Sequence, residues 1–474
     1  MAESNQITGQ GFLKDLGAGL TRWTEKWIPD SLVIVFILSI IAYVLALIWG
    51  FGKEVDFGSR LYGGVEAWGK GFWIYLKFAM QMCLIMMTGY ILALSPPVRR
   101  LLEGLAGLPD KDKPQQAIIV MALFSTLSAW LSWGLSIIGS AVLALFIVRR
   151  NPKVDYRLLV ASAYLGLGCT WHSGLTGSAT LMMASPGNAL VKAAIKEGWI
   201  TGPISTGTTI FNPFNLILTV VVIIVVTWLM AKMHPSPEKT YVVQPELMDR
   251  LNIYEPPRRE TAKSPSDWMN WWPGFNIIIV VGGAIALYSY LKGKPAGNWL
   301  TLNNIIFFFL MLGIIFHWRP WSFLKAAEES GKAVWGIVIQ FPFYAGIYGL
   351  IKFTLLSQVF TGWFVAISAP ATFLMFVYWY GGILNYLVPS GGGEWLMTAP
   401  YLLPAAQELG VAAHKTVIAY AWGDMMTDMI QPFWAIAMLA VAKLNFRDIM
   451  GYLMVIFVIY FVITSIAFLI LPWI

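Results

Sequence analysis

The stretch AIIVMALFSTLSAWLSWGLSIIGSAVLALFIV, residues 117–148, decides the fold that we expect for this chain. Its 32 residues carry no charge, and as a single helix they would be about 48 Å long. The hydrocarbon core of a bilayer is only about 30 Å thick. Lys113 precedes the stretch and Arg149 follows it, and basic residues mark the cytoplasmic side of a membrane. Both ends therefore lie on one side, which predicts a re-entrant helical hairpin with its tip at residues 132–134.

The composition of the whole chain agrees with a membrane protein. Of its 474 residues, 58% are hydrophobic and 12% are charged, whereas about a quarter of a soluble domain is charged. Residues 31–51 form the clearest of the stretches long enough to span a bilayer. The net charge of +7 does not indicate nucleic-acid binding, because the Lys and Arg residues lie between the hydrophobic segments. We expect an all-α polytopic membrane protein with about nine spans and two hairpins.

A second charge-free stretch, residues 353–393, repeats the first pattern in the other half of the chain. Its 41 residues are too many for one crossing. We expect an interfacial helix up to about residue 369 and then a second re-entrant hairpin at about 371–409, with its tip at residues 389–393. The order of span, span, hairpin, broken span and span thus occurs twice from opposite sides of the membrane. That order predicts an inverted repeat.

The same pattern divides the chain into four parts. We expect residues 1–30 to form a cytoplasmic amphipathic helix, residues 31–231 the first repeat, residues 232–291 a polar cytoplasmic loop with a linking helix, and residues 292–474 the second repeat. The positive charges place the N-terminus in the cytoplasm and the C-terminus on the opposite side of the membrane. Both cysteines lie within apolar segments and are expected to be core residues.

The segment GLGCTWHSGLTGS, residues 166–178, is too rich in small and polar residues for a plain lipid-facing helix. Each glycine disfavours a helix by about 1 kcal/mol relative to alanine, so the segment predicts a break in a span. Its hydroxyl groups can bind ions or carboxylate oxygens. Close helix packing through small residues is the alternative.

His172 lies within that segment, where an imidazole can relay protons or pair with a carboxylate. A hydrogen-bonded packing role fits this position equally well. The other three histidines, His234, His317 and His414, lie next to helix ends and are expected to be solvated.

Asp424 and Asp428 lie four residues apart, on one face of a helix within an apolar span. An aspartate inside a membrane costs about 2.5 to 3.5 kcal/mol on insertion scales, so such residues mark a cation or proton site by default. Pro432 removes a backbone hydrogen bond and would free carbonyl groups near Thr427 to act as ligands. A structural ion pair or a carboxylate in a wet vestibule would also explain the pair.

The tip of the second hairpin contains three successive glycines, residues 391–393. Their backbone N–H groups can approach an anion closely, and the positive end of the following helix would face it. A flexible tight turn is the alternative. Glu394 follows directly and either faces the mouth of the cavity or stabilises the N-terminus of the helix.

These arguments give two sets of candidate residues. The substrate-binding set is Ser132, Gly134, His172, Ser173, Thr176, Ser178, Asn385, Ser390, Gly391, Gly392 and Gly393. The set that couples transport to a cation or proton is Asp424, Thr427, Asp428 and Glu394. No catalytic residue and no cofactor are expected. The coupling ion is either Na⁺ at Asp424 and Asp428 or a proton.

Four motifs resemble the bacterial short-chain fatty acid transporter family, which is grouped with elevator-type carriers of the ion transporter superfamily. They are LSWGLS at 131–136, HSGLTGS at 172–178, VPSGGGEW at 388–395 and WGDMMTDMIQP at 422–432. The resemblance covers nearly the whole chain. It implies uptake of acetoacetate, butyrate or similar monocarboxylates by a homodimer, with a scaffold domain and a moving transport domain that holds both hairpins. It also implies a bacterial inner membrane, so that the expected C-terminus lies in the periplasm.

Other functions fit parts of the pattern. A carrier of dicarboxylates or amino acids would share the architecture, and a passive channel would differ in being unable to accumulate its substrate. An intramembrane aspartyl protease needs two facing carboxyl groups that share a proton, usually from separate elements. Two aspartates on one helix fit that requirement poorly. We therefore expect a carrier that is embedded in the lipid bilayer and binds a small carboxylate and no nucleic acid.

Overall fold

The computed structural model describes residues 31–243, 264–295 and 298–471, and residues 26, 29, 255 and 257 singly. Every regular element in these residues is a helix. Seven of the described helices are long and apolar enough to cross a membrane, or eight if the bent pair α16 and α17 forms one span. The all-α polytopic fold is therefore confirmed. The expected helix at residues 1–30 falls outside the described residues, apart from residues 26 and 29.

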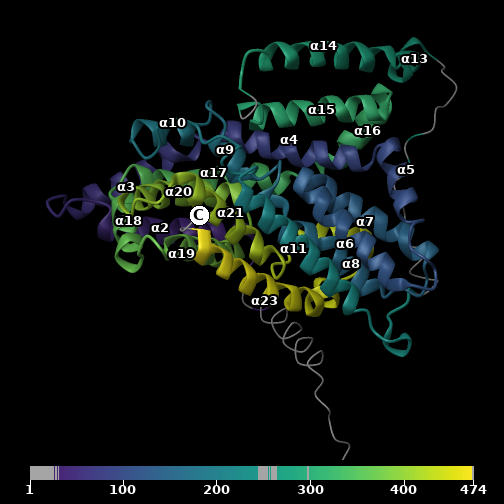
Figure 1. Ribbon diagram of the computed structural model, residues 1–474. Helices are drawn as coiled ribbons and strands as arrows, with labels where there is room; N and C mark the ends of the chain where they lie inside the picture. The colour runs from purple at the N-terminus through teal and green to yellow at the C-terminus, as the bar shows by residue number, and fades with distance from the viewer. Residues whose placement is uncertain are drawn as a thin grey trace, which may run out of the picture.

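The first half of the chain contains the following helices (Figure 1): α2 Ser31–Trp49, α3 Phe57–Phe72, α4 Leu76–Ala93, α5 Pro96–Leu105, α6 Pro114–Leu131, α7 Trp133–Arg150, α8 Tyr156–Cys169, η1 Trp171–Ser173, α9 Ser178–Met183, α10 Ala189–Lys196 and α11 Pro213–Lys232. The second half contains η2 Pro237–Lys239, α13 Pro265–Trp271, α14 Gly274–Leu291, α15 Leu302–His317, α16 Pro320–Gly331, α17 Trp335–Lys352, α18 Leu356–Ile367, α19 Phe373–Leu387, α20 Gly391–Glu408, α21 Ala413–Asp428, α22 Ala435–Ala442 and α23 Phe446–Ile470.

The charge-free stretch at 117–148 folds back on itself as a pair of packed helices, α6 and α7. The chain is extended at Ser132, whose hydroxyl caps α7 by accepting a hydrogen bond from the N–H of Leu135. Ser136, just after the turn, donates to the carbonyl of Ser125 at 2.8 Å, which ties the two arms together. One continuous long helix is thus excluded, and the turn lies at the residue that the sequence predicts.

The second charge-free stretch gives α18 and then a second hairpin, α19 and α20. The connection is residues 388–390, and Ser390 caps α20 by accepting a hydrogen bond from the N–H of Gly393. The phenol groups of Tyr380 and Tyr401, one on each arm, are joined by a hydrogen bond of 2.7 Å. This pair of helices runs from Phe373 to Glu408, and the expected re-entrant hairpin spanned about 371–409.

Two other helices are interrupted in their middle. The first interruption separates α8 from α9 and contains Gly174, where a Cβ atom would collide with the backbone of Trp130 on α6. The second separates α21, which ends at Asp428, from α22, and contains Pro432, which has no N–H to continue a helix. Each interruption leaves backbone groups without helical partners.

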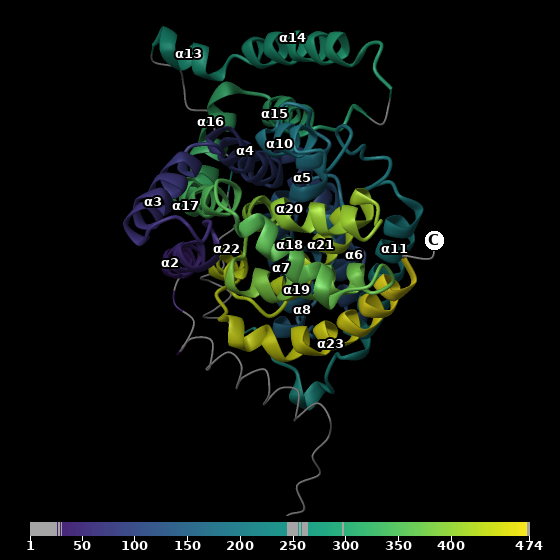
Figure 2. The ribbon, with the colours of Figure 1, turned by 90° about the vertical axis from the view of Figure 1, so that its left-hand side faces the viewer.

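The helices form two groups that meet along a shared face (Figures 1 and 2). One group contains both hairpins, the interrupted helices, α11 and α23, and the other contains α2, α3, α4 and α15 to α17. α4 packs against α7, and α17 packs against α20, so each hairpin contacts the second group. α14 lies at the edge of the molecule on α15 (Figure 1).

The structure also corrects the expectation that His317 is solvated. Its side chain is 2% exposed, with hydrogen bonds to the Ile91 carbonyl at 2.9 Å and to the Ser322 hydroxyl at 3.1 Å. The reason is that α16, which the sequence did not reveal, begins three residues later and packs on α4. His234 and His414 are partly buried.

Candidate functional site

The two interruptions meet in the interior of the molecule, and both hairpin tips contact them. From the first tip, the N–H of Trp133 donates to the Thr176 hydroxyl at 3.2 Å. From the second tip, the carbonyl of Gly391 accepts a hydrogen bond of 2.7 Å from the Tyr420 hydroxyl. Segments that are far apart in the sequence are therefore brought together around one point.

A hydrogen bond of 2.6 Å between His172 Nδ1 and Asp424 Oδ2 joins the two interrupted helices, and both side chains are fully buried. The Ala179 N–H donates to His172 Nε2 at 3.0 Å, so Nε2 is an acceptor. The ring proton must then lie on Nδ1, and His172 donates it to Asp424. A neutral His172 is thus held in one tautomer by the start of α9.

Asp428 accepts two hydrogen bonds of 3.0 Å. One comes from the indole N–H of Trp171 and the other from the amide of Asn385 on α19. Asn385 also donates to the Thr427 hydroxyl, which in turn donates to the carbonyl of Gly382. Asp428 is therefore fixed between the first interruption and the second hairpin, and each of its oxygens has a donor.

Glu394 lies in the first turn of α20, with a side chain that is completely buried. Neither of its carboxyl oxygens has a hydrogen-bond donor among the described residues, and the same holds for Asp424 Oδ1. Glu394 lies next to Asp424 and Tyr420 of α21. It does not face a cavity mouth, which corrects one of the two expectations for it, although its place at a helix N-terminus matches the other.

The glycines of the second tip form the first turn of α20 and pack without spare room. A Cβ at Gly391 would lie 2.6 Å from Asp424 Oδ2, and a Cβ at Gly392 would lie 2.6 Å from the Phe78 ring of α4. The first N–H groups of a helix have no partner within the helix. These residues therefore bring backbone donors close to the meeting point of the helices.

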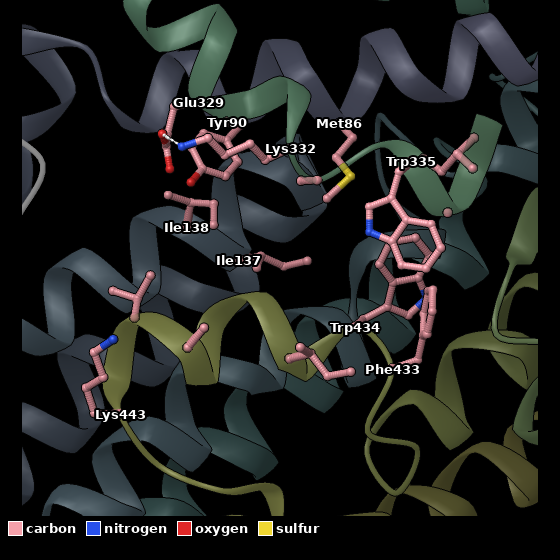
Figure 3. Close-up of a pocket in the computed structure, with 16 residues that line it drawn as sticks. Met86, Tyr90, Ile137, Ile138, Glu329, Lys332, Trp335, Phe433, Trp434 and Lys443 are labelled. Carbon is pink, nitrogen blue, oxygen red and sulfur yellow. Dashed lines mark hydrogen bonds and ion pairs between the residues drawn. The ribbon is translucent and has the colours of Figure 1, made fainter. Parts of the chain in front are cut away.

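A small cavity of about 30 Å³ lies between the second tip and α17. Its lining is Met82, Trp133, Leu167, Trp171, Ser178, Ile337, Phe341, Ser390, Gly391, Gly392 and Trp434. No Lys or Arg is among these residues. A larger cavity of about 500 Å³ shares Ile337 and Trp434 with it (Figure 3). Lys332 and Lys443 line that larger cavity, and Lys332 pairs with Glu329 at 2.6 Å.

Some of the remaining predicted residues lie at the hairpin tips or the small cavity, and others lie away from them. Ser178 lines the small cavity, and Ser132 and Gly134 pack against Gly89 of α4 at the first tip. Ser173 instead contacts α11, where its hydroxyl accepts from Thr219 and its carbonyl accepts from Asn215. Ser173 is thus held away from the cavity.

Two important residues were absent from the predicted sets. Tyr420 holds the second tip and lies one helical turn before Asp424, a spacing that was visible in the sequence. Trp434 lies at the junction of both cavities, 5.4 Å from the Trp133 ring, and no sequence signal indicated that contact.

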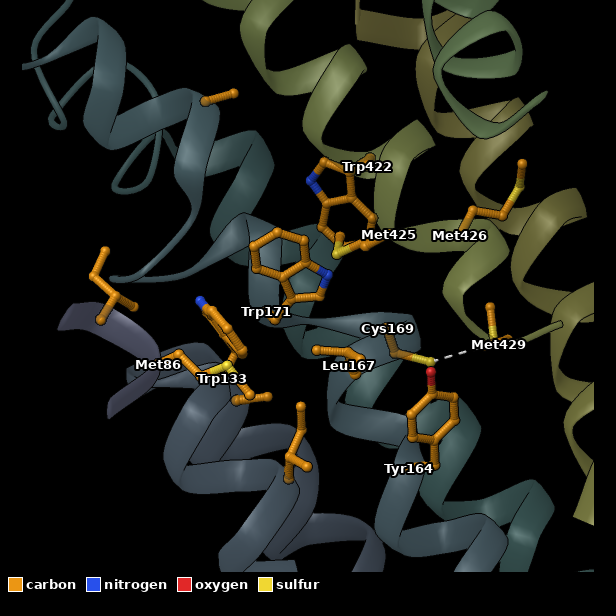
Figure 4. Close-up of a cluster of buried hydrophobic side chains, with 14 of the residues drawn as sticks. Met86, Trp133, Tyr164, Leu167, Cys169, Trp171, Trp422, Met425, Met426 and Met429 are labelled. Carbon is orange, nitrogen blue, oxygen red and sulfur yellow. Dashed lines mark hydrogen bonds between the residues drawn. The ribbon is translucent and has the colours of Figure 1, made fainter. Parts of the chain in front are cut away.

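Sulfur-containing and aromatic side chains pack behind the site (Figure 4). Cys169 lies 3.7 Å from the sulfur of Met429, and both cysteines are buried and unpaired, as expected for core residues. In the described part of the chain, no group of three His, Cys, Asp or Glu side chains is placed to hold a metal ion.

The fold and its long apolar helices define a polytopic α-helical membrane protein. Two solved transporters share the fold: YdaH of Alcanivorax borkumensis, with a TM-score of 0.54 and 14% identity over 94% of this chain and 97% of that one, and MtrF of Neisseria gonorrhoeae, with a TM-score of 0.53 and 15% identity over 97% of both chains. At these identities the likeness concerns the fold alone.

The particular family follows from the sequence comparisons. The family model described as "Short chain fatty acid transporter" matches residues 12–471. Two relatives carry the description "Putative short-chain fatty acid transporter". The one from Escherichia coli K12 is 33% identical and covers 91% of this chain and 94% of its own length. The one from Haemophilus influenzae is 30% identical and covers 92% of this chain and 94% of its own length.

The chain therefore belongs to the short-chain fatty acid transporter family, which confirms the resemblance seen in its motifs. It is a multi-pass membrane transporter of a small carboxylate and not an enzyme.

Proposed function

We propose that this protein is a secondary active carrier that brings short monocarboxylates, such as butyrate and acetoacetate, across the bacterial inner membrane together with a cation or a proton. The observation that carries the proposal is the meeting of both hairpin tips with a chain of buried carboxyl groups, Glu394, Asp424 and Asp428. The names of the two relatives support the choice of cargo.

The carboxylate of the substrate binds at the N-terminus of α20. Gly391 and Gly392 line the small cavity there, and their backbone N–H groups and the Ser390 hydroxyl are suitable donors. Because no Lys or Arg lines this cavity, the anion depends on backbone dipoles. A dicarboxylate would need a second group of donors on the opposite wall, which is apolar.

The opposite wall suits a short aliphatic chain. Met82 of α4 and Ile337 and Phe341 of α17 form it, and the Trp133 and Trp171 rings lie beside it. Burial of one CH₂ group contributes about 0.8 kcal/mol, so even a few methylene groups add useful affinity. The cavity of about 30 Å³ has room for only two or three water molecules, at roughly 10 to 15 Å³ for each, so the tip moves to admit a substrate.

The buried acids account for the coupling. An isolated carboxylate in an apolar interior is very unfavourable and is normally neutralised by a proton or a cation. Substrate and ion can then move together because one hairpin tip contacts both. The two helix groups act as a transport domain and a scaffold, in an inverted repeat whose re-entrant hairpins face opposite sides. A homodimer in which the scaffolds form the interface completes the proposal.

Radiolabelled butyrate uptake into proteoliposomes tests this function, with sodium and proton gradients imposed separately. We expect saturable uptake that accumulates butyrate above its outside concentration under one of the two gradients, and competition by acetoacetate. Uptake that never exceeds equilibrium would indicate a channel. Competition by succinate or an amino acid, with none by acetoacetate, would replace the monocarboxylate cargo by one of the alternatives.

A further inference from the structure

Six polar side-chain atoms on α20 and α21 are buried without a hydrogen-bond partner among the described residues. They are Glu394 Oε1 and Oε2, Trp395 Nε1, Thr398 Oγ1, Thr416 Oγ1 and Asp424 Oδ1. These two helices pack against each other. Buried polar atoms in proteins are nearly always hydrogen-bonded, so a group of exceptions requires an explanation.

The state of Asp424 follows from its hydrogen bonds. His172 must donate its Nδ1 proton to Asp424 Oδ2, because its other nitrogen accepts the N–H of Ala179. Asp424 is therefore an acceptor on Oδ2 and still has an unused oxygen, Oδ1. Glu394 is its direct neighbour. Two neighbouring carboxyl groups satisfy each other when one of them carries a proton, which then forms the hydrogen bond between them.

Among the described residues, no cationic side chain neutralises this pair. The ionisable groups around Glu394 are Asp424, Asp428 and Tyr420 on α21, Tyr401 on α20, Tyr380 on α19, Tyr344 on α17 beside Gly393, and His172 behind Asp424. α9 and α18, which also pack on α20, contain no ionisable residue. The lysines of the packed helices interact elsewhere: Lys352 pairs with Glu197, and Lys415 donates to the Leu471 carbonyl.

We propose that Glu394 carries the proton that is cotransported with the substrate and donates it to Asp424 Oδ1 whenever the second hairpin tip is seated on α21. This inference rests on the proposed function and goes beyond it by naming the ion and the residue that carries it. Asp424 and His172 are positioning residues for this proton, whereas Asp428 is held by its own two donors.

The place of Glu394 explains how the proton would control the tip. Glu394 is one helical turn from Ser390, and its N–H donates to the Ser390 carbonyl at 2.8 Å. When Glu394 loses its proton, two carboxylates lie side by side in an apolar interior and repel each other. That repulsion separates α20 from α21 and breaks the bond between Tyr420 and Gly391. The carrier without this proton therefore cannot keep its tip seated around a substrate, whereas the carrier that keeps the proton binds and releases the substrate on either side of the membrane.

The test compares Glu394→Gln with Glu408→Gln, an exposed control on the same helix, in proteoliposomes loaded with a pH-sensitive dye. A glutamine can donate to Asp424 without a proton to lose. We expect Glu394→Gln to exchange butyrate in counterflow within about twofold of wild type, while proton-driven accumulation and proton flux fall at least tenfold. Glu408→Gln should match wild type in all three measurements. Proton flux that persists in Glu394→Gln, or wild-type accumulation driven only by sodium, would overturn the inference.

A second measurement on the wild-type carrier removes the dependence on the variant's folding. Dicyclohexylcarbodiimide reacts with protonated carboxyl groups in apolar surroundings, so peptide mass spectrometry should find it on Glu394 and not on Glu408, with less modification as pH rises. An unmodified Glu394 at a pH that supports proton-driven uptake would refute the proposal. Failure of the proposed function itself would differ, because wild-type butyrate counterflow would then be absent.

Discussion

Three acidic residues of the site show how neighbours determine the role of one chemical group. Asp428 has a donor on each oxygen, Asp424 has one on a single oxygen, and Glu394 has none among the described residues. A carboxylate with two donors is well suited to a fixed position. One without donors is suited to binding and releasing a proton or a cation.

We predict that Asp428→Asn reduces concentrative butyrate uptake at least tenfold and leaves the protein folded. The new amide would place an N–H against Trp171 or Asn385, and a buried donor without an acceptor costs about 1 to 3 kcal/mol. Uptake in sealed vesicles measures the effect. Asp112→Asn is the control, because Asp112 is an exposed partner of Lys153. Wild-type rates in the Asp428 variant would remove this carboxylate from the mechanism.

The second residue prediction concerns Gly392, which we expect to tolerate no side chain. In Gly392→Val the Cβ would lie 2.6 Å from the Phe78 ring and 3.2 Å from the Ser178 Cβ, so the tip cannot seat and transport falls below about a tenth of wild type. Gly362→Val on α18, where nothing lies within 4 Å, should transport normally. Equal apparent affinity and rate in both variants would mean that the glycines only form a turn.

At the scale of elements, small residues allow the interrupted helix α8 to approach the first hairpin. A Cβ at Gly166 would collide with the carbonyl oxygen of Ser125 on α6, and the Gly166 N–H donates to the Ser125 hydroxyl at 3.0 Å. Such close backbone contact is typical of helices packed within membranes. The contact supports close helix packing, the alternative given for residues 166–178, at Gly166.

We predict that Gly166→Leu destabilises the purified protein by about 1 to 3 kcal/mol or more, because overpacking forces two backbones apart. We expect the melting temperature to fall. It is measured by heating samples and quantifying the remaining folded protein by size-exclusion chromatography. Gly104→Leu on α5, which has open space around it, serves as the matched control. If the two variants had the same melting temperature, close packing at Gly166 would not limit the stability of the protein.

The elements that the sequence did not reveal are those without a strong hydrophobic signal. α3 contains five glycines and several charged residues, yet it packs on α17 with Gly71 against the backbone of Gly349. α16 is short and polar, and it is bent by 52° relative to α17. Their helical form depends on contacts with distant partners, which local patterns do not contain.

At the scale of the whole molecule, charge placement predicts the side of the membrane to which the larger cavity opens. Its lining includes Glu329, Lys332 and Lys443, which lie on the cytoplasmic side of the charge map. The cavity shares Ile337 and Trp434 with the small cavity, so on that charge map we expect the site to open toward the cytoplasm through the larger cavity (Figure 3).

We predict that a membrane-impermeant maleimide labels Lys443→Cys only from the cytoplasmic side and Lys53→Cys only from the periplasmic side. The native thiols Cys83 and Cys169 are buried and should give a background of less than about a tenth of either signal. Intact cells and inverted vesicles provide the two directions. The opposite pattern of labelling would reverse the proposed topology.

By itself, the sequence determined that the chain lies in a membrane, where its two hairpins turn, and which segments are interrupted. Those properties depend on local composition, because burial in lipid, basic flanks and helix-breaking residues act over a few turns. Only the tertiary structure decided which acid has which partner. Asp424 meets His172 from 252 residues away and Asp428 meets Trp171 from 257, whereas Ser173 faces α11. Such contacts arise from the packing of whole helices, so no local pattern encodes them.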